Sequence, residues 1–147
     1  MDRFLIIGSN SFSGAYFCSY LLDREIEVYG ISRSQEPHSA FLPHKWSGES
    51  KNYKFKKLDI NKDLNEVLNL VRDFKPNFIV NFAAQGMVAE SWITPEDWYQ
   101  TNVVSQVKLH NELRKIKDLK KYVHVSTPEA YGSTDGGWLK ENYHFAP

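Results

Sequence analysis

Short apolar stretches alternate with longer polar or amphipathic stretches along the whole chain. Strand-like stretches lie at residues 4–7, 27–31, 53–58, 78–82 and 122–126. The first is apolar at every position and ends at Gly8, which is typical of a strand covered on both faces. Strands that alternate with helices indicate βαβ units. We therefore predict an α/β fold, an open doubly wound parallel sheet, with the strand order 3-2-1-4-5 that right-handed crossovers favour.

Three helices are predicted between these strands. The first covers about residues 14–23, and its apolar side would consist of Tyr16, Phe17, Tyr20 and Leu21. The second ends before Pro76 and has a stripe with the spacing of one helix face, formed by Leu64, Val67, Leu68 and Val71. The third begins at Pro95, where a missing N–H costs nothing, and runs to about Lys117. No linker divides the chain, so residues 1–147 are expected to form one domain.

The polar segment 34–52 contains prolines and a glycine and predicts a long surface loop. Such a loop either shapes a ligand site or is simply mobile, and we favour mobility.

Composition narrows the classes of partner. Eighteen basic and eighteen acidic residues leave no formal net charge, which argues against nucleic acid or an anionic membrane as a partner. The apolar runs are far shorter than the roughly 18 residues of a membrane span, and the N-terminus lacks a secretory pattern, so we expect a cytoplasmic protein with a small ligand. Cys18 is the single cysteine and is expected to be an ordinary buried thiol. No metal site is expected.

The turn after the first strand reads Gly8-Ser9-Asn10-Ser11-Phe12-Ser13-Gly14. Backbone N–H groups and the positive end of a helix suit a pyrophosphate there, so we predict a dinucleotide site of the Rossmann type, with Asn10 and Phe12 among its contacts. Gly8 permits the tight turn, and Gly14 lets the helix approach the strand. Ser11 carries a Cβ atom that disfavours a positive φ, which makes it the weak position. By itself, such a turn could also be a plain connection.

The second strand ends in Ser32-Arg33-Ser34, where an NAD-preferring fold usually has an acidic residue. The Arg33 guanidinium and the Ser32 hydroxyl could instead hold a 2′-phosphate. We therefore favour NADP as the cofactor, with NAD still open. The alternative is that Arg33 is a solvated surface side chain.

Several motifs in order resemble the extended short-chain dehydrogenase/reductase family. They are the Gly8 to Gly14 turn, Leu58-Asp59-Ile60, Asn81-Phe82-Ala83-Ala84-Gln85, Pro95 with Tyr99-Gln100-Thr101-Asn102-Val103, and Ser126-Thr127-Pro128-Glu129-Ala130-Tyr131-Gly132. Within that family the chain looks most like the N-terminal portion of the nucleotide-sugar 4,6-dehydratases of the dTDP-glucose and GDP-mannose types. Nucleotide-sugar 4-epimerases and decarboxylases are close alternatives.

The resemblance implies roles for individual residues. Asp59 and Ile60 would contact the adenine, and the backbone below the pyrophosphate and nicotinamide ribose would belong to Phe82, Ala83 and Ala84. The sugar-phosphate side would be lined by Gln85 and Ser91.

The resemblance also assigns the reacting groups. Thr127, which follows a predicted buried strand, would hydrogen-bond the 4-hydroxyl of the sugar, and Glu129 would remove the C5 proton. As an alternative, Thr127 could cap the following turn and Glu129 could be a solvated carboxylate. Pro128 stands where the dTDP-glucose type has an aspartic acid, so the general acid is unassigned. Met87 stands where relatives commonly have histidine, so that substrate contact is not transferred.

The family's catalytic tyrosine and lysine, four residues apart on one helix, do not follow Glu129. Tyr53 and Lys57 match the spacing but lie on a predicted strand, where four residues span about 13 Å, so this match is accidental. We expect a sheet that stops after its fifth strand, without the C-terminal substrate-binding part. Such a chain should bind cofactor and turn nothing over.

The leading hypothesis is therefore the N-terminal part of a nucleotide-sugar 4,6-dehydratase acting on a nucleotide-activated hexose. A non-catalytic NADP-sensing protein and a free-standing flavodoxin-like domain are the other hypotheses. Relatives often dimerise through two helices per subunit, and the helix at 95–117 would be one of them, which leaves a homodimer open.

Overall fold

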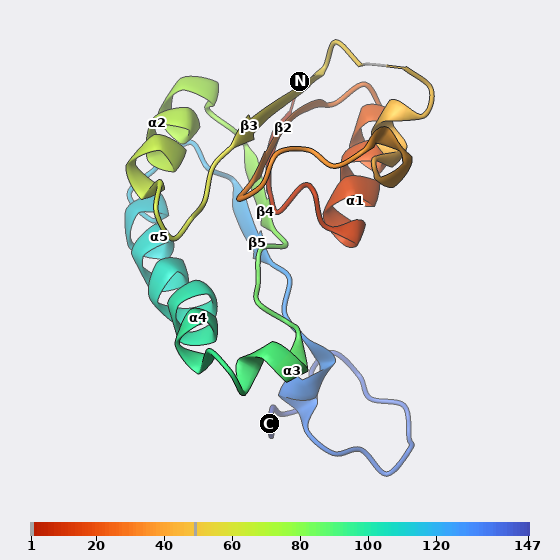
Figure 1. The fold of residues 1–147 in the computed structure, drawn as a ribbon, viewed down its shortest axis with the longest axis vertical. Coiled ribbons are helices and arrows are strands. Elements are labelled where there is room, and N and C mark those ends of the chain that lie inside the picture. The colour runs from red at the N-terminus through yellow and green to blue at the C-terminus, as the bar shows by residue number, and fades with distance from the viewer. Residues whose placement is uncertain (1, 49) are drawn as a thin grey trace.

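A computed structural model describes residues 2–48 and 50–147 (Figure 1). Its centre is a five-stranded sheet in the order β3-β2-β1-β4-β5, in which every neighbouring pair is parallel. The strands are β1 (Arg3–Ile7), β2 (Glu27–Ser32), β3 (Tyr53–Lys57), β4 (Phe78–Asn81) and β5 (Lys121–His124). The predicted doubly wound fold and its strand order are confirmed.

Helices cover both faces of the sheet, with α1 (Phe12–Leu22) on one face and α2 (Leu64–Phe74) and α5 (Ser105–Leu113) on the other (Figure 1). Successive side chains of a strand point to opposite faces. Accordingly, Leu5 and Ile7 belong to the core cluster under α2 and α5, whereas Ile6 belongs to the cluster under α1. Burial on both faces explains why residues 4–7 of β1 form a continuous apolar run.

The α2 stripe is confirmed, because Val67, Leu68 and Val71 are buried. The helix ends where Lys75 takes a left-handed conformation (φ 49°), directly before Pro76. A residue before proline is disfavoured in the helical conformation, so Pro76 fixes this end.

The predicted apolar side of α1 is wrong in part. Tyr16 and Tyr20 are 47% and 50% exposed, and the buried seam consists of Gly14, Ala15, Cys18 and Leu21. Small residues let the helix lie close to the sheet, which leaves the larger rings at its flanks. Cys18 is fully buried, as predicted.

The segment predicted as a mobile surface loop is partly built into the core. It forms two 3-10 turns, η1 (Ser39–Phe41) and η2 (Pro43–Lys45), and η2 packs against α1. Leu42 is 1% exposed, and Pro43 and His44 are also buried. The surface-loop prediction is wrong for residues 42–44, because the side chains of these residues are buried where η2 packs against α1.

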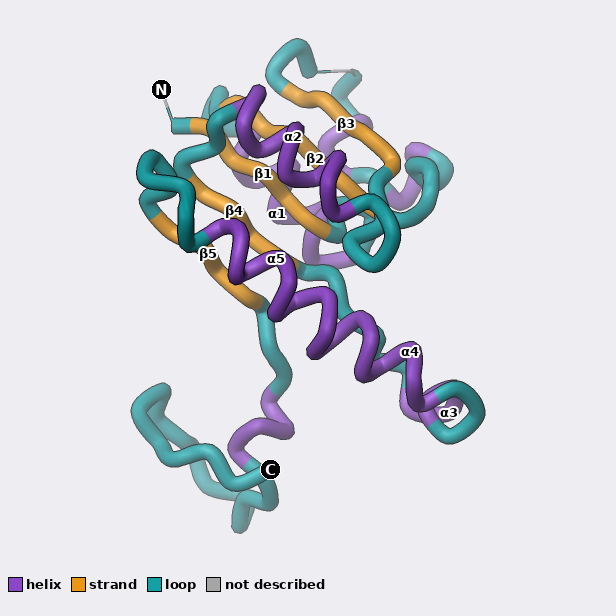
Figure 2. Tube along the Cα trace, turned by 90° about the vertical axis from the view of Figure 1, so that its left-hand side faces the viewer, coloured by secondary structure: helices purple, strands orange, loops and turns teal. Residues whose placement is uncertain are grey.

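The predicted helix at 95–117 is shorter and contains an irregular turn. A short α3 (Val88–Ser91) precedes α4 (Pro95–Tyr99), a π turn η3 (Gln100–Val104) and α5, which ends at Leu113. Figure 2 shows α4 and α5 as one helical arm that extends beyond the sheet.

The last strand differs from the prediction of a buried strand. Within the described residues β5 pairs with β4 alone, and Lys121, Val123 and His124 are exposed. The chain then forms a 3-10 turn, η4 (Pro128–Tyr131), and returns to it, since the Ala146 N–H donates to the Ala130 carbonyl at 3.0 Å. No helix in residues 2–48 or 50–147 is long and apolar enough to cross a membrane.

Candidate functional site

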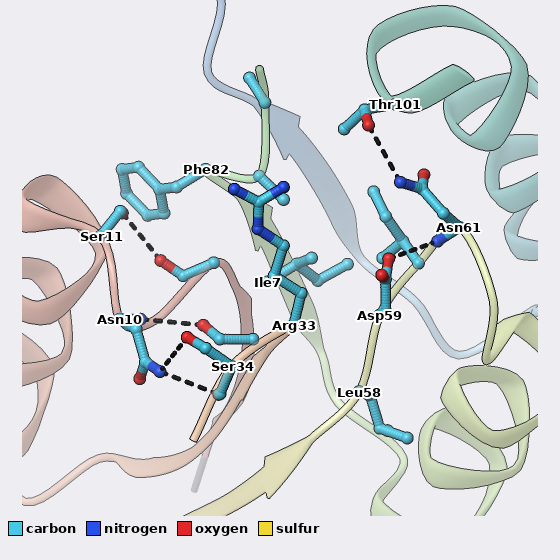
Figure 3. Close-up of a pocket in the computed structure, with 15 residues that line it drawn as sticks. Ile7, Asn10, Ser11, Arg33, Ser34, Leu58, Asp59, Asn61, Phe82 and Thr101 are labelled. Atoms are coloured by element: carbon cyan, nitrogen blue, oxygen red, sulfur yellow. Dashed lines mark hydrogen bonds between the residues drawn. The ribbon is translucent and has the colours of Figure 1, made fainter. Parts of the chain in front are cut away.

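A cavity of about 290 Å³ lies at the carboxyl ends of four adjacent strands, β1 to β4 (Figure 3). It is lined by Ile7, Gly8, Asn10, Ser11, Ser32, Arg33, Ser34, Leu58, Asp59, Ile60, Asn61, Phe82, Ala83, Ala84 and Thr101. In an open α/β sheet this position, where the strand order reverses, is where ligands bind. Apart from Phe12 and Gly14, every residue predicted to contact the cofactor lines this one cavity.

Gly8 joins the turn to two strands at once. Its φ is +82°, and its N–H donates to the Ile31 carbonyl of β2 at 2.8 Å. A Cβ atom on Gly8 would lie 2.9 Å from the Ala83 nitrogen, beside β4. Glycine is therefore required both for the backbone conformation and for space, as the sequence indicated.

Ser11 does not weaken the turn as predicted. Its φ is −70°, an ordinary value, and it is the N-cap of α1. The Ser11 hydroxyl donates to the Gly8 carbonyl at 2.8 Å and accepts from the Gly14 N–H at 3.1 Å. The expected steric penalty is absent because Gly8, not Ser11, has the positive φ, and an N-cap serine stabilises the helix start.

The two predicted contacts that miss the cavity do so for different reasons. Phe12 is 79% exposed and packs against Tyr16, with ring centroids 4.8 Å apart. Gly14 is buried behind the turn, where a Cβ atom would collide with the Gly8 carbonyl oxygen. Gly14 thus allows the close approach that was predicted, whereas the Phe12 side chain lies outside the cavity.

The end of β2 is tied to the turn through Asn10. The Asn10 backbone N–H donates to the Ser32 hydroxyl at 2.9 Å, and the side-chain amide donates to the Gln35 carbonyl at 2.9 Å. Arg33 lies between these contacts, and its side chain extends into the space between the turn and the segment after β3 (Figure 3). No ion pair of Arg33 is found among residues 2–48 and 50–147.

The segment after β3 forms the opposite wall. Asp59 accepts a hydrogen bond from the Asn61 N–H at 2.8 Å, which orders the turn. The Asn61 amide donates to the Thr101 hydroxyl of η3 at 3.0 Å. Asn61 was missed in the sequence, where only its position next to Asp59-Ile60 pointed to it. The π turn brings Thr101 to the cavity, and such turns are frequent at functional sites.

A buried amide network holds the backbone after β4. Asn81 is fully buried, accepts from the Ala83 N–H at 2.8 Å, and donates to Gln106 Oε1 and the Tyr122 hydroxyl, both at 2.8 Å. Burial raises the pKa of Tyr122 to about 12, so this hydroxyl stays protonated at neutral pH. The network fixes residues 82–84, which form the floor of the cavity.

The two predicted substrate residues lie outside this cavity. The backbone of Gln85 is held by the Asn102 amide through two hydrogen bonds of 2.8 and 2.9 Å. The Ser91 hydroxyl donates to the Val88 carbonyl within α3. Their roles toward a sugar stay predictions.

Thr127 and Glu129 follow β5 and are exposed. Thr127 stands at the N-cap position of η4, but its side chain makes no capping hydrogen bond, so that half of the alternative is wrong. The exposure of Glu129 agrees with the other half, a solvated carboxylate. Tyr53 and Lys57 lie on β3, not on a helix, which supports the interpretation that their spacing is accidental. The reacting roles of Thr127 and Glu129 stay predictions.

A second cavity of about 280 Å³ lies beside β3 and is lined by Glu36, His44, Lys45, Ser50, Tyr53 and Phe55. Lys45 Nζ is 2.6 Å from Glu36 Oε2, and His44 Nε2 is 3.7 Å from Glu36 Oε1. Burial lowers the pKa of His44, and Glu36 opposes this effect. Within the part of the chain that the structure describes, no three histidine, cysteine or acidic side chains are placed to hold a metal ion.

Comparison with known proteins agrees with this geometry. The model of the GDP-mannose 4,6 dehydratase family matches residues 5–147. A GDP-mannose 4,6-dehydratase of Vibrio cholerae serotype O1 is 28% identical over 152 residues, which cover 97% of this chain and 40% of the relative.

Two solved structures share the fold. The dTDP-glucose 4,6-dehydratase of Bacillus anthracis, in complex with NAD, matches with a TM-score of 0.79 and 25% identity, over 100% of this chain and 44% of that one. A UDP-glucose-4-epimerase of Stenotrophomonas maltophila with bound NAD has a TM-score of 0.83 at 17% identity, over 99% of this chain and 43% of that one, and shows the fold alone. The chain therefore spans less than half the length of these proteins. With the family model matched over residues 5–147, the chain belongs to the GDP-mannose 4,6 dehydratase family.

Proposed function

We propose that this chain is the cofactor-binding part of an NAD(P)-dependent nucleotide-sugar 4,6-dehydratase, a lyase. The observation that carries the proposal is the single cavity where the glycine-rich turn, the Asp59 segment and the backbone after β4 meet. Relatives of the same family are named as dehydratases, and one solved relative holds NAD.

The residues present fit a dinucleotide. The N-terminus of α1 would receive the pyrophosphate. The N–H groups of Phe12 and Ser13 in its first turn have no acceptor within the helix, and the helix dipole favours an anion there. Asp59 and Ile60 would flank the adenine. Ala83 and Ala84 are small enough for the ribose to approach the backbone, and Gly8, which has no Cβ atom, lets the turn lie directly against the backbone of Phe82 and Ala83.

We infer that the cofactor is NADP. The cavity is lined by Ser32 at the end of β2 and by Arg33 and Ser34 after it, and none of these residues is acidic. A carboxylate after β2 usually accepts from the ribose 2′-hydroxyl, whereas an arginine suits a 2′-phosphate. The absence of an ion pair of Arg33 within the described ranges supports this role.

The reaction would divide between cofactor and protein. The nicotinamide supplies reversible hydride transfer, from C4 of the sugar and back to C6. The Thr127 hydroxyl would hold the 4-oxygen, and the Glu129 carboxylate would remove the proton at C5, which the C4 ketone makes acidic. Pro128 has no side-chain donor, so another group must protonate the departing hydroxyl. A C5 base favours dehydration over 4-epimerisation, which needs none.

The arm formed by α4 and α5 suits a homodimer. Tyr99, Val103 and Val107 recur every four residues along it and are 70%, 50% and 63% exposed. An apolar stripe of this kind is a typical interface, and we propose that two copies pair through it.

The first test is calorimetric titration of the chain with NADPH and with NADH. We expect NADPH to bind at least about tenfold more tightly, which corresponds to roughly 1.4 kcal/mol, and the Arg33→Ala variant to lose the preference. If circular dichroism shows a folded protein and neither cofactor binds, the proposed function is wrong.

The second test joins residues 1–147 to the remaining C-terminal part of the Vibrio cholerae relative. The chimera should convert a nucleotide hexose, with GDP-mannose as the probe, to its 4-keto-6-deoxy product, and the Glu129→Gln variant should bind cofactor without forming product. A folded, cofactor-loaded chimera in which Glu129→Gln remains fully active would refute the assigned base.

A further inference from the structure

Asn10 belongs to the glycine-rich turn, but its side chain reaches across to the segment after β2 (Figure 3). The side-chain Nδ2 donates to the Gln35 carbonyl at 2.9 Å and to the Ser34 carbonyl at 3.1 Å, and it lies 3.4 Å from the Ser34 hydroxyl. The backbone N–H of the same residue donates to the Ser32 hydroxyl at 2.9 Å. One residue therefore holds the chain on both sides of Arg33.

We propose that Asn10 is a positioning residue that sets the preference for a 2′-phosphorylated cofactor by fixing the backbone that carries Arg33. The inference rests on the proposed function and deepens it. An arginine side chain has many rotamers, and ordering it on binding costs free energy. A backbone already fixed at Ser32, Ser34 and Gln35 reduces that cost for the contact made by the guanidinium.

The chemistry of these contacts requires an amide at position 10. Its partners at Ser34 and Gln35 are carbonyl oxygens, so they need an N–H donor. An aspartate has the same size but would place carboxylate oxygens against those carbonyls, and an alanine would leave them without a partner. The Asn10 Oδ1 atom is buried without a protein partner, so the three contacts of Nδ2 determine how the amide is oriented.

The rest of the same segment provides a matched control. Beyond Gln35, the chain is held by the ion pair between Lys45 and Glu36 and by the burial of Leu42. A Lys45→Met variant removes the ion pair, which lies outside the dinucleotide cavity. If any loosening of the segment changed cofactor preference, Lys45→Met would act as Asn10→Ala does.

The test is a double-mutant cycle on the full 147-residue chain, with dissociation constants for NADPH and NADH measured by calorimetry. Asn10→Ala and Asn10→Asp should each weaken NADPH binding by about tenfold and NADH binding by less than about threefold, since two or three neutral hydrogen bonds are lost. Arg33→Ala should abolish the preference. Asn10→Ala added to Arg33→Ala should then leave the NADPH to NADH ratio unchanged, and Lys45→Met should retain the wild-type ratio.

Each other outcome decides against a specific claim. Equal weakening of both cofactors by Asn10→Ala overturns the inference and makes Asn10 part of the pyrophosphate turn alone. A NADPH to NADH ratio in the Asn10→Ala and Arg33→Ala double variant that differs from that of Arg33→Ala also overturns it, because Asn10 would then act independently of Arg33. A folded wild-type chain that binds neither cofactor overturns the proposed function and, with it, this inference. Binding without any preference for NADPH overturns the NADP assignment and the inference while cofactor binding stands.

Discussion

Replacing Gly8 with alanine tests whether the turn packs so closely against the backbone after β4 that no Cβ atom fits between them. The φ of +82° at Gly8 costs an alanine about 1–2 kcal/mol. The new Cβ atom would also lie 2.9 Å from the Ala83 nitrogen and 3.0 Å from the Phe82 carbonyl carbon. These are backbone atoms that cannot rotate away, and overpacking of this kind costs about 1–3 kcal/mol. We expect the free energy of unfolding to fall by about 2–5 kcal/mol.

Two other glycines allow the cost of the positive φ to be separated from the cost of the steric overlap. Gly136 has a φ of +77° but no atom within 4 Å of an added Cβ, so Gly136→Ala should show the conformational cost at most. Gly86 has open space and no positive φ, so Gly86→Ala should be near neutral. Urea unfolding followed by circular dichroism gives the free energy of each variant.

The same substitution should also affect the cavity, because Phe82 and Ala83 line it. A shift of β4 away from the new methyl group moves both residues, and NADPH should bind more weakly to the folded Gly8→Ala variant. The reasoning is refuted if Gly8→Ala unfolds at the same urea concentration as Gly136→Ala, since the contact with β4 would then cost nothing.

Three further predictions concern buried polar groups. Burial lowers the pKa of His44 below its ordinary 6.5, so on acidification this side chain is protonated in the unfolded chain before it is protonated in the folded chain. The free energy of unfolding should therefore fall as the pH drops below about 6.5 and level off below the pKa of the folded state. His44→Gln should remove this slope from urea titrations at several pH values, and His38→Gln, at an exposed position, should retain it. Burial raises the pKa of the Cys18 thiol to about 12, so iodoacetamide at pH 8 should label it only in urea, and rapid labelling of the folded protein would contradict the packing of α1. Asn81→Leu should cost about 2–4 kcal/mol in urea unfolding because it leaves several buried groups unpaired, whereas Tyr122→Phe should cost about 1 kcal/mol, and equal effects would argue against the network.

The sheet could be predicted because its signals are local. The continuous apolar run of β1 and the helical spacing of Val67, Leu68 and Val71 each follow from burial of a known face, and the crossover rule then orders the strands. What failed depends on distant partners. Tyr16 counts as apolar in a helical pattern, yet it lies at the exposed flank of α1, whereas Phe17 packs against Phe4 of β1. The exposure of β5 likewise depends on which strands lie beside it.

In the site, too, features with a local sequence signal could be predicted and those that depend on distant residues could not, as the glycine-rich turn shows. A sequence pattern predicts that Gly8, Asn10 and Ser11 belong to a phosphate-binding turn, but it does not say which residue has the positive φ or where an amide points. The structure assigns the left-handed conformation to Gly8, so Ser11 is free to cap α1. Contacts such as that of Asn10 with Gln35 or of Asn61 with Thr101 join residues 25 and 40 positions apart. Neither partner has a local signal for the other, because each pair meets only after the sheet has brought the carboxyl ends of its strands together. Most residues that line the cavity could therefore be predicted from motifs, whereas the contacts that position them require the fold.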